Sequence, residues 1–467
     1  MNRRHILKAA AGLGVLASGA ALGRYALVAP PTSAQLDSVD ALAVRIYEAL
    51  PQDIRERACV SYDHPLRQCH NRGLGMGGVN VTALHLDWDT RCAISDLLHA
   101  GLSPVGRLRV PYQDATRWAG VNFMQLLICG DPRKPPYQIV LSGIHLNLRL
   151  GDARAEGIAF GGPQVYGDQR GDEVAGLPGN AYRYQWQRAH RFVTTLTSAE
   201  RTAVRVARAP AQVNIGLQGR NGRFDGLAIG ELSASKRALA HDLVAGILDT
   251  YAEQDAAYAW QCLARNGGVD ALRFADYEED FHGSRRAGHE PSQIFRLEGP
   301  SAVFHFRGEP HVHAFINVAM DGDRPLSLGE RLGENPRVLE GENLRAFFET
   351  AMCTQGEADL AYMPSSSVVG RLREGAVRNG DIWAAESWID ELVLLEARGA
   401  DLSSEIAQRL RARGKSVQGG ATYRIVTTGY VAHGSSSAIL GRVLEPRSRG
   451  LLRDAICAHA RVHGFDV

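Results

Sequence analysis

The sequence lacks the patterns that identify several common kinds of site. Its seven cysteines include no CxxC pair, which argues against a thiolate zinc site. The cysteines could instead form one or two disulfides or remain as buried thiols. No GxSxG, HExxH or P-loop motif occurs, so the enzyme classes that depend on them lose support. The formal net charge is +1, which argues against nucleic acid as a partner.

A basic and then apolar segment opens the chain. Arg3-Arg4 precedes an isoleucine, a leucine and a lysine, and an apolar stretch of small residues then covers 9–22. This stretch is shorter than the roughly 20 residues that span a bilayer. A small-residue cleavage site, Thr32-Ser33-Ala34, follows it. We predict that residues 1–34 form a twin-arginine signal peptide, with an uncleaved N-terminal anchor as the alternative.

This prediction makes the twin-arginine translocation machinery a partner and places the mature protein in the periplasm or outside the cell. Cleavage removes four basic residues and no acid, so the formal net charge changes from +1 to −3. The remaining chain is long enough for two or three domains with real cores. No later segment is long and apolar enough to span a bilayer, so we expect no membrane contact after cleavage and no nucleic-acid partner.

Hydrophobic periodicity predicts an α+β fold, in which helices surround a largely antiparallel sheet and a smaller C-terminal α/β domain follows. An amphipathic stripe predicts a helix over 36–58, and Thr197 and Glu200 have the spacing of a capping box. The glycine-rich segment 161–180 is expected to be a loop. The predicted strands are 121–129, 137–149, 293–298, 301–306 and 311–318. We expect one domain over 36–335, which would hold a metal site, and a second over 338–467.

Gly73, Gly75 and Gly78 satisfy the GxGxxG pattern of dinucleotide-binding loops. That pattern has meaning after an apolar strand, and the segment before these glycines is polar. We therefore interpret it as a structural loop.

Three strand-like segments carry the most informative histidines. His311 and His313 are two residues apart, so in a strand both imidazoles point to the same face, roughly 6.5–7 Å apart along the chain. Such a pair can chelate one metal ion. Alternation along 142–149 places His145 on the polar face of another strand, and we predict His145 as the third ligand of a site with an open position. The alternative is a His-x-His pattern that arose by chance.

Glu298 and Arg296 lie in the strand that precedes His305. Glu298 is a candidate general base, or a carboxylate ligand that would give a two-histidine site suited to iron. Arg296 is a candidate for anion binding or orientation. The role of His305 depends on the hairpin at 307–310: a two-residue loop would turn it away from His311, and an odd-length loop would turn it toward His311.

These residues predict an exported metal-dependent enzyme with one divalent ion, either zinc, iron or copper, and a small-molecule substrate that the sequence does not identify. The leading hypothesis is a hydrolase in which the metal activates water. The alternatives are an iron or copper oxidase that uses the same ligands, and a periplasmic protein that binds a ligand without catalysis.

Three separated motifs resemble the domain-of-unknown-function 3500 family over roughly 60–325. They are the segment from Gly143 to Leu148, the segment from Phe295 to Pro300, and Pro310-His311-Val312-His313. The family pattern has a first histidine where this chain has Ile144. The resemblance implies a shared site and names no reaction.

The segment 338–440 resembles the C-terminal domain of 5′-nucleotidases. The motifs are the run from Ala358 to Met363, Gly380-Asp381-Ile382 and the run from Tyr423 to Tyr430. The resemblance implies a domain that grips a nucleoside with arginines and stacked aromatic rings. This chain departs from it at Val369, where the family has an arginine, and at Trp388, where it has phenylalanine. A packing or substrate-capping module is the alternative.

Overall fold

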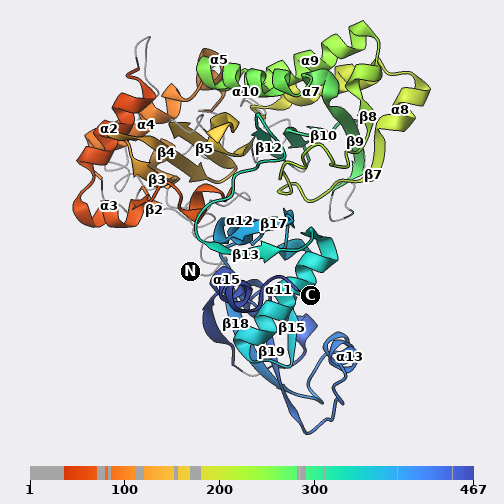
Figure 1. The fold of residues 1–467 in the computed structure, drawn as a ribbon. Coiled ribbons are helices and arrows are strands. Elements are labelled where there is room, and N and C mark those ends of the chain that lie inside the picture. Colours follow the sequence, from red (N-terminus) through yellow and green to blue (C-terminus); the bar gives the residue numbers. More distant parts are fainter. Residues whose placement is uncertain are drawn as a thin grey trace, which may run out of the picture.

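The computed structural model describes residues 36–466 except 71–78, 82–85, 111–119, 152–155, 169–179, 281–282, 284–290, 310, 387 and 444. The predicted signal peptide and the glycine motif at 73–78 lie outside the described residues. Figure 1 shows a large sheet with helices packed on it, formed by residues up to about 318, and a smaller mixed unit that follows in cyan and blue.

Twelve strands of the described chain form the large sheet, in the order β1-β3-β4-β5-β6-β12-β11-β10-β9-β7, with β2 beside β3 and β8 beside β9. The pairs β1–β3 and β7–β9 are parallel and the other pairs of this sheet are antiparallel. The predicted α+β class with a largely antiparallel sheet is therefore confirmed. The strands are β1 Cys59–Val60, β2 Val79–Asn80, β3 Gln125–Asp131, β4 Lys134–Gly143, β5 Leu146–Gly151, β6 Gln164–Asp168, β7 Arg205–Arg208, β8 Leu227–Ala228, β9 Arg273–Glu279, β10 Ile294–Gly299, β11 Ala302–Arg307 and β12 Val312–Val318.

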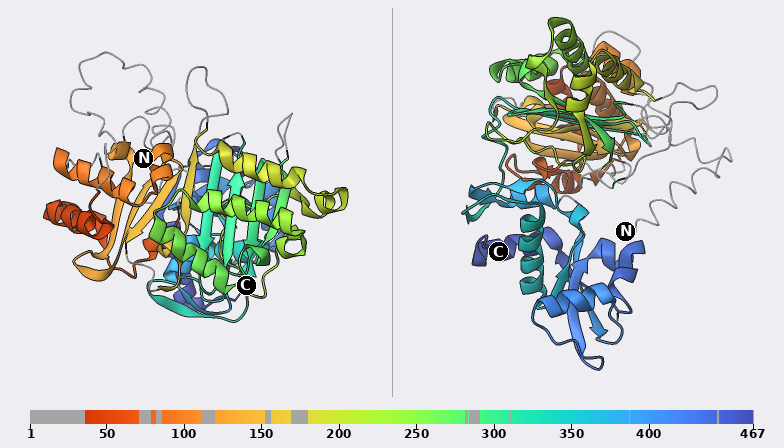
Figure 2. Two further views of the ribbon diagram at one scale, coloured as in Figure 1. Left: turned by 90° about the horizontal axis from the view of Figure 1, so that it is seen from above. Right: turned by 90° about the vertical axis from the view of Figure 1, so that its right-hand side faces the viewer.

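Helices cover one face of this sheet, as both views of Figure 2 show. Alternation turns the apolar side chains of β3, β4, β5, β10, β11 and β12 toward these helices, where they form one buried core. The opposite face carries the polar side chains of the same strands together with two smaller apolar clusters, one around Leu127 and Val140 and one around Val303 and Phe315. The helices of this unit are α2 Val39–Ala49, α3 Gln52–Ala58, α4 Trp88–Ala100, α5 Pro104–Arg109, α7 Arg183–Thr194, α8 Ser198–Val204, α9 Ala234–Leu248 and α10 Glu253–Arg265.

Three predicted elements differ from the structure. The single strand expected over 137–149 is the hairpin of β4 and β5, which turns at Ile144 and His145. The single helix expected over 36–58 is two helices, because Leu50 takes an extended conformation before Pro51. The segment 161–180 was expected to be a loop, and this is wrong for β6, all five residues of which are buried between β5 and β12. This strand contains a glycine and has a polar residue at each end. Its only strongly apolar residues are Val165 and Tyr166, so the sequence pattern did not indicate a strand. The capping box of Thr197 and Glu200 is confirmed.

The smaller unit contains a four-stranded sheet in the order β15-β19-β18-β20, in which β15 is parallel to β19, and two strand pairs, β13–β17 and β14–β16. Its strands are β13 Arg331–Asn335, β14 Leu339–Glu340, β15 Leu360–Tyr362, β16 Arg371–Leu372, β17 Gly375–Arg378, β18 Glu391–Arg398, β19 Thr422–Thr428 and β20 Arg447–Leu451. Its helices are α11 Gly341–Gly356, α12 Asn379–Ala385, α13 Ser404–Ala412, α14 Gly429–His433 and α15 Leu452–His463. The predicted boundary between 335 and 338 stays a prediction, although β13 pairs with β17 across it.

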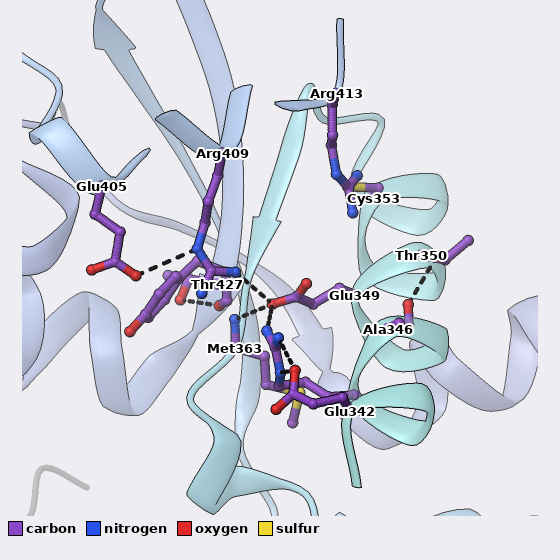
Figure 3. A network of polar contacts seen from close by, with 12 residues as sticks. Glu342, Ala346, Glu349, Thr350, Cys353, Met363, Glu405, Arg409, Arg413 and Thr427 are labelled. Atoms are coloured by element: carbon purple, nitrogen blue, oxygen red, sulfur yellow. Dashed lines mark hydrogen bonds and ion pairs between the residues drawn. The ribbon is translucent and has the colours of Figure 1, made fainter. Parts of the chain in front are cut away.

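A buried carboxylate ties α11 to α13 and β15 in this unit. Glu349 accepts hydrogen bonds from Arg345 at 2.7 Å, from Arg409 at 3.4 Å and from the backbone N–H of Met363 at 3.2 Å (Figure 3). Because its two cationic partners come from different helices, the charge is compensated where it is buried. No described helix of the protein is both long and apolar enough to cross a membrane.

Candidate metal centre

The structure brings three of the predicted site residues together. One ligand atom from each of His145, His311 and His313 can be chosen so that all lie within 4.8 Å of one another. The ring centroids are 4.9 Å apart for His145 and His311, 4.5 Å for His145 and His313, and 4.6 Å for His311 and His313. The Nε2 atoms of His311 and His313 are 2.7 Å apart.

His145 reaches this cluster from a turn, whereas the sequence predicted that it lies within a strand. β4 ends at Gly143 and β5 begins at Leu146, so Ile144 and His145 form the tip of a tight hairpin. His145 has a positive φ of 56°, which is uncommon for a residue other than glycine. Ile144 is 42% exposed, while His145 is buried at 6%. The turn therefore directs the imidazole inward.

Gly167 of β6 has no side chain, and this leaves room for the histidines to come together. It pairs with His313 on β12, and the register of β5 with β6 continues to His145 opposite it. A Cβ at Gly167 would lie 3.1 Å from the Cβ of His145 and 2.2 Å from the carbonyl oxygen of Val312. Sequence reasoning missed this residue because it interpreted the segment as a loop.

The surroundings of His313 suit a metal ligand. Burial is the main cause that holds the pKa of His313 well below its usual range, and the charge of Arg307 is the second. The ring is therefore neutral at physiological pH, with one ring nitrogen free to donate a lone pair.

Gln212 contacts the other side of the same ring. Its Nε2 lies 2.9 Å from His313 Nδ1, and its Oε1 is buried without a partner. Rotating the amide by 180° exchanges these two atoms without changing its shape. Oε1 then accepts a hydrogen bond from Nδ1–H of His313 and is no longer a buried acceptor without a partner. Nε2 of His313 remains as the lone-pair donor. The sequence gives no signal for Gln212, which lies in a loop 101 residues before His313.

His305 is on the same face of the sheet as His313. Arg307 pairs with His313 and His305 pairs with Phe315, so the β11–β12 connection has the odd length that turns His305 toward this face. His305 lies outside the three-histidine group. It receives a 3.4 Å contact from Arg296 Nε, and burial holds its pKa well below the usual value.

The structure places Arg296 and Glu298 away from the three histidines. Counting strand and residue spacings through the register, their Cα atoms are about 12 and 16 Å from that of His313. Arg296 contacts Glu298 at 3.2 Å and donates to the carbonyl of Asn214 at 2.9 Å. Glu298 accepts from Gln218 at 2.9 Å. Both residues therefore bind the segment 212–218, which lies over the polar face, and their catalytic roles stay predictions.

A cavity of about 330 Å³ is lined in part by that segment. Asn214 and Ile215 of that segment and Asn317 of β12 line it on one side, and Val369, Gly370 and Arg371 line it from the smaller unit. None of the three histidines lines it. All seven cysteines are free in the structure.

Comparisons with known proteins identify no family for the chain. No protein-family model and no curated protein matches it. Among solved structures, a 5′-nucleotidase precursor from Thermus thermophilus is similar with a TM-score of 0.26 and 11% identity, covering 41% of this chain and 51% of that one. A putative 5′-nucleotidase from Staphylococcus aureus has a TM-score of 0.22 and 12% identity, covering 37% and 48%.

The chain thus spans about half the length of these two structures. A likeness this partial says nothing about the chemistry of the three histidines. The resemblance of 60–325 to the domain-of-unknown-function 3500 family stays a prediction.

Proposed function

We propose that the protein is an exported hydrolase that uses one divalent metal ion held by His145, His311 and His313. The observation that carries the proposal is the convergence of three imidazoles from two separate hairpins within 4.8 Å. Three imidazole ligands suit zinc, copper or iron, and three protein ligands leave a position for water or substrate.

The residues of the chain support a bound ion in three ways. His313 stays neutral because burial of most of its ring lowers its pKa, so protons do not compete for its lone pair. The amide of Gln212 orients the ring of His313. His311 and His313 each keep part of their surface exposed among the described residues, which is compatible with an ion that also binds water. A bound ion would lower the pKa of its water and supply the nucleophile for hydrolysis.

The double variant His311→Ala/His313→Ala tests this proposal. Its matched control is His241→Ala/His433→Ala, which removes two exposed imidazoles elsewhere in the chain. Elemental analysis of the folded, exported protein should find about one ion per chain in the wild type and the control, and none in the test variant. Unchanged metal content in the folded test variant would end the proposal.

The identity of the ion separates the rival functions. Zinc favours the hydrolase, whereas iron or copper with substrate-dependent oxygen consumption favours an oxidase at the same ligands. A native protein that contains no metal favours a binding protein without catalysis. In that case the smaller unit, with its resemblance to a nucleoside-gripping domain, becomes the first place to look for the ligand.

A further inference from the structure

Arg307 is a buried cation beside the three histidines. It is the last residue of β11 and pairs directly with His313 on β12, so its side chain leaves the sheet on the face that carries the histidines. Opposite residues in antiparallel strands have Cβ atoms about 5 Å apart, so the guanidinium and the imidazole are neighbours. Of the charged groups that act on His313, Arg307 has the largest effect.

The guanidinium of Arg307 has no partner among the described residues. Arg307 is 8% exposed, its Nε is buried without a hydrogen bond, and no ion pair within the described chain involves it. Asp280 is the acid whose charge acts on it. Glu309, two residues further on, has a buried Oε2 that is also without a partner, so these two charges do not compensate each other. A buried charge without a counterion in contact costs several kcal/mol, and an arginine cannot lose its proton to avoid that cost.

We infer that Arg307 binds an oxyanion of the substrate, with one anionic oxygen on the guanidinium and another directed at the metal position. This inference rests on the proposed function, because it takes the three histidines as the place of the ion. A divalent ion and one guanidinium would give the site a strong positive charge, and the ligand group contains no carboxylate among the described residues. The planar fork of arginine matches two oxygens of a phosphate or a carboxylate. The substrate class is therefore an anionic ester or acid.

Arg307→Met and Arg307→Lys test the inference, with Arg324→Met as the matched control because that side chain is 89% exposed. Each folded, full-length mature protein is loaded with zinc, and its metal content is measured first. Inorganic phosphate and acetate are then titrated separately by calorimetry, so that the two arms distinguish a phosphate-bearing from a carboxylate-bearing ligand. The same titrations are repeated on metal-free protein.

We expect Arg307→Met to keep one ion per chain, because removing a neighbouring positive charge favours a bound cation. Its affinity for the preferred anion should fall at least tenfold, Arg307→Lys should retain part of the affinity, and the control should match the wild type. Equal anion affinity in the wild type and both Arg307 variants would overturn the inference.

The metal-free titration separates this inference from the proposed function. If the wild type holds no metal and still binds anions through Arg307, the metal proposal fails and the anion site stands. If the wild type holds metal and binds neither anion, the metal proposal stands and the anion site fails. Loss of zinc from a folded Arg307→Met protein would also count against the inference, because it contradicts the expected repulsion between the two cations.

Discussion

Replacing Arg149 with methionine should destabilise the large sheet more than any exposed arginine substitution. Arg149 is 1% exposed on β5, and its guanidinium donates four hydrogen bonds. The acceptors are the carbonyl of Pro163 at 2.9 Å, the carbonyl of Arg67 at 2.6 Å, Gln138 Oε1 at 3.0 Å and the carbonyl of Cys69. These bonds hold the segment around 67–69 onto the polar face of the sheet.

The magnitude follows from the acceptors that the change leaves behind. Methionine fills much of the volume but donates nothing, and each buried acceptor without a partner costs about 1–3 kcal/mol. If water reaches two of the four, the loss is about 4 kcal/mol, a large share of the 5–15 kcal/mol that is typical of folded domains. Urea unfolding of the mature protein, followed by circular dichroism, measures this loss.

The control for this experiment is Arg133→Met, which removes an exposed guanidinium from a surface pair with Asp131. It should leave the unfolding midpoint essentially unchanged because solvent screens that pair. A loss below about 1 kcal/mol for Arg149→Met would refute the reasoning, since it would mean that the four acceptors are satisfied without the guanidinium.

Two further changes test the sheet and the site. Burial raises the pKa of Asp276 to about 6 from an ordinary value of 3.8. Between about pH 4 and 6 the folded state therefore holds a proton that the unfolded state has released, so the free energy of unfolding falls as the pH rises through this range. Asp276→Asn, which keeps an oxygen to accept the N–H of Ser292, should therefore raise the free energy of unfolding by up to about 3 kcal/mol at pH 7.5 and leave it unchanged at pH 4, as measured by urea titration at both pH values. Gly167→Ala should lower stability by about 1–3 kcal/mol and release metal, because the new methyl group meets Val312 and His145; a normal melting temperature with full metal loading would contradict this.

Much of the site followed from local patterns. The spacing of two residues placed His311 and His313 side by side, although β12 begins only at Val312, and alternation along β10, β11 and β12 separated most of the apolar side chains from the polar ones. The choice of His145 as their companion came from its place among polar strand residues, and the structure puts it beside them although it lies in a turn.

Other features of the site depended on long-range pairing. Glu298 and Arg296 share the polar face with the histidines, and a sequence cannot show that two strand spacings and several residues separate them. The side of the sheet on which His305 lies was left open because it depends on the parity of one hairpin connection. Gln212 and Arg307 were not identified from the sequence, because neither belongs to a recognisable motif. Their roles follow from their position next to His313, which only the structure shows.

Residues a few positions apart were enough to predict the alternation along the strands, the proximity of His311 to His313 and the capping box at Thr197. Tertiary structure alone decided that β6 enters between β5 and β12, so that Gly167 opens the space in which His145 meets the other two. The physical reason is that strand order and register are set by burial across the whole sheet, where residues far apart in the chain compete for the same neighbours.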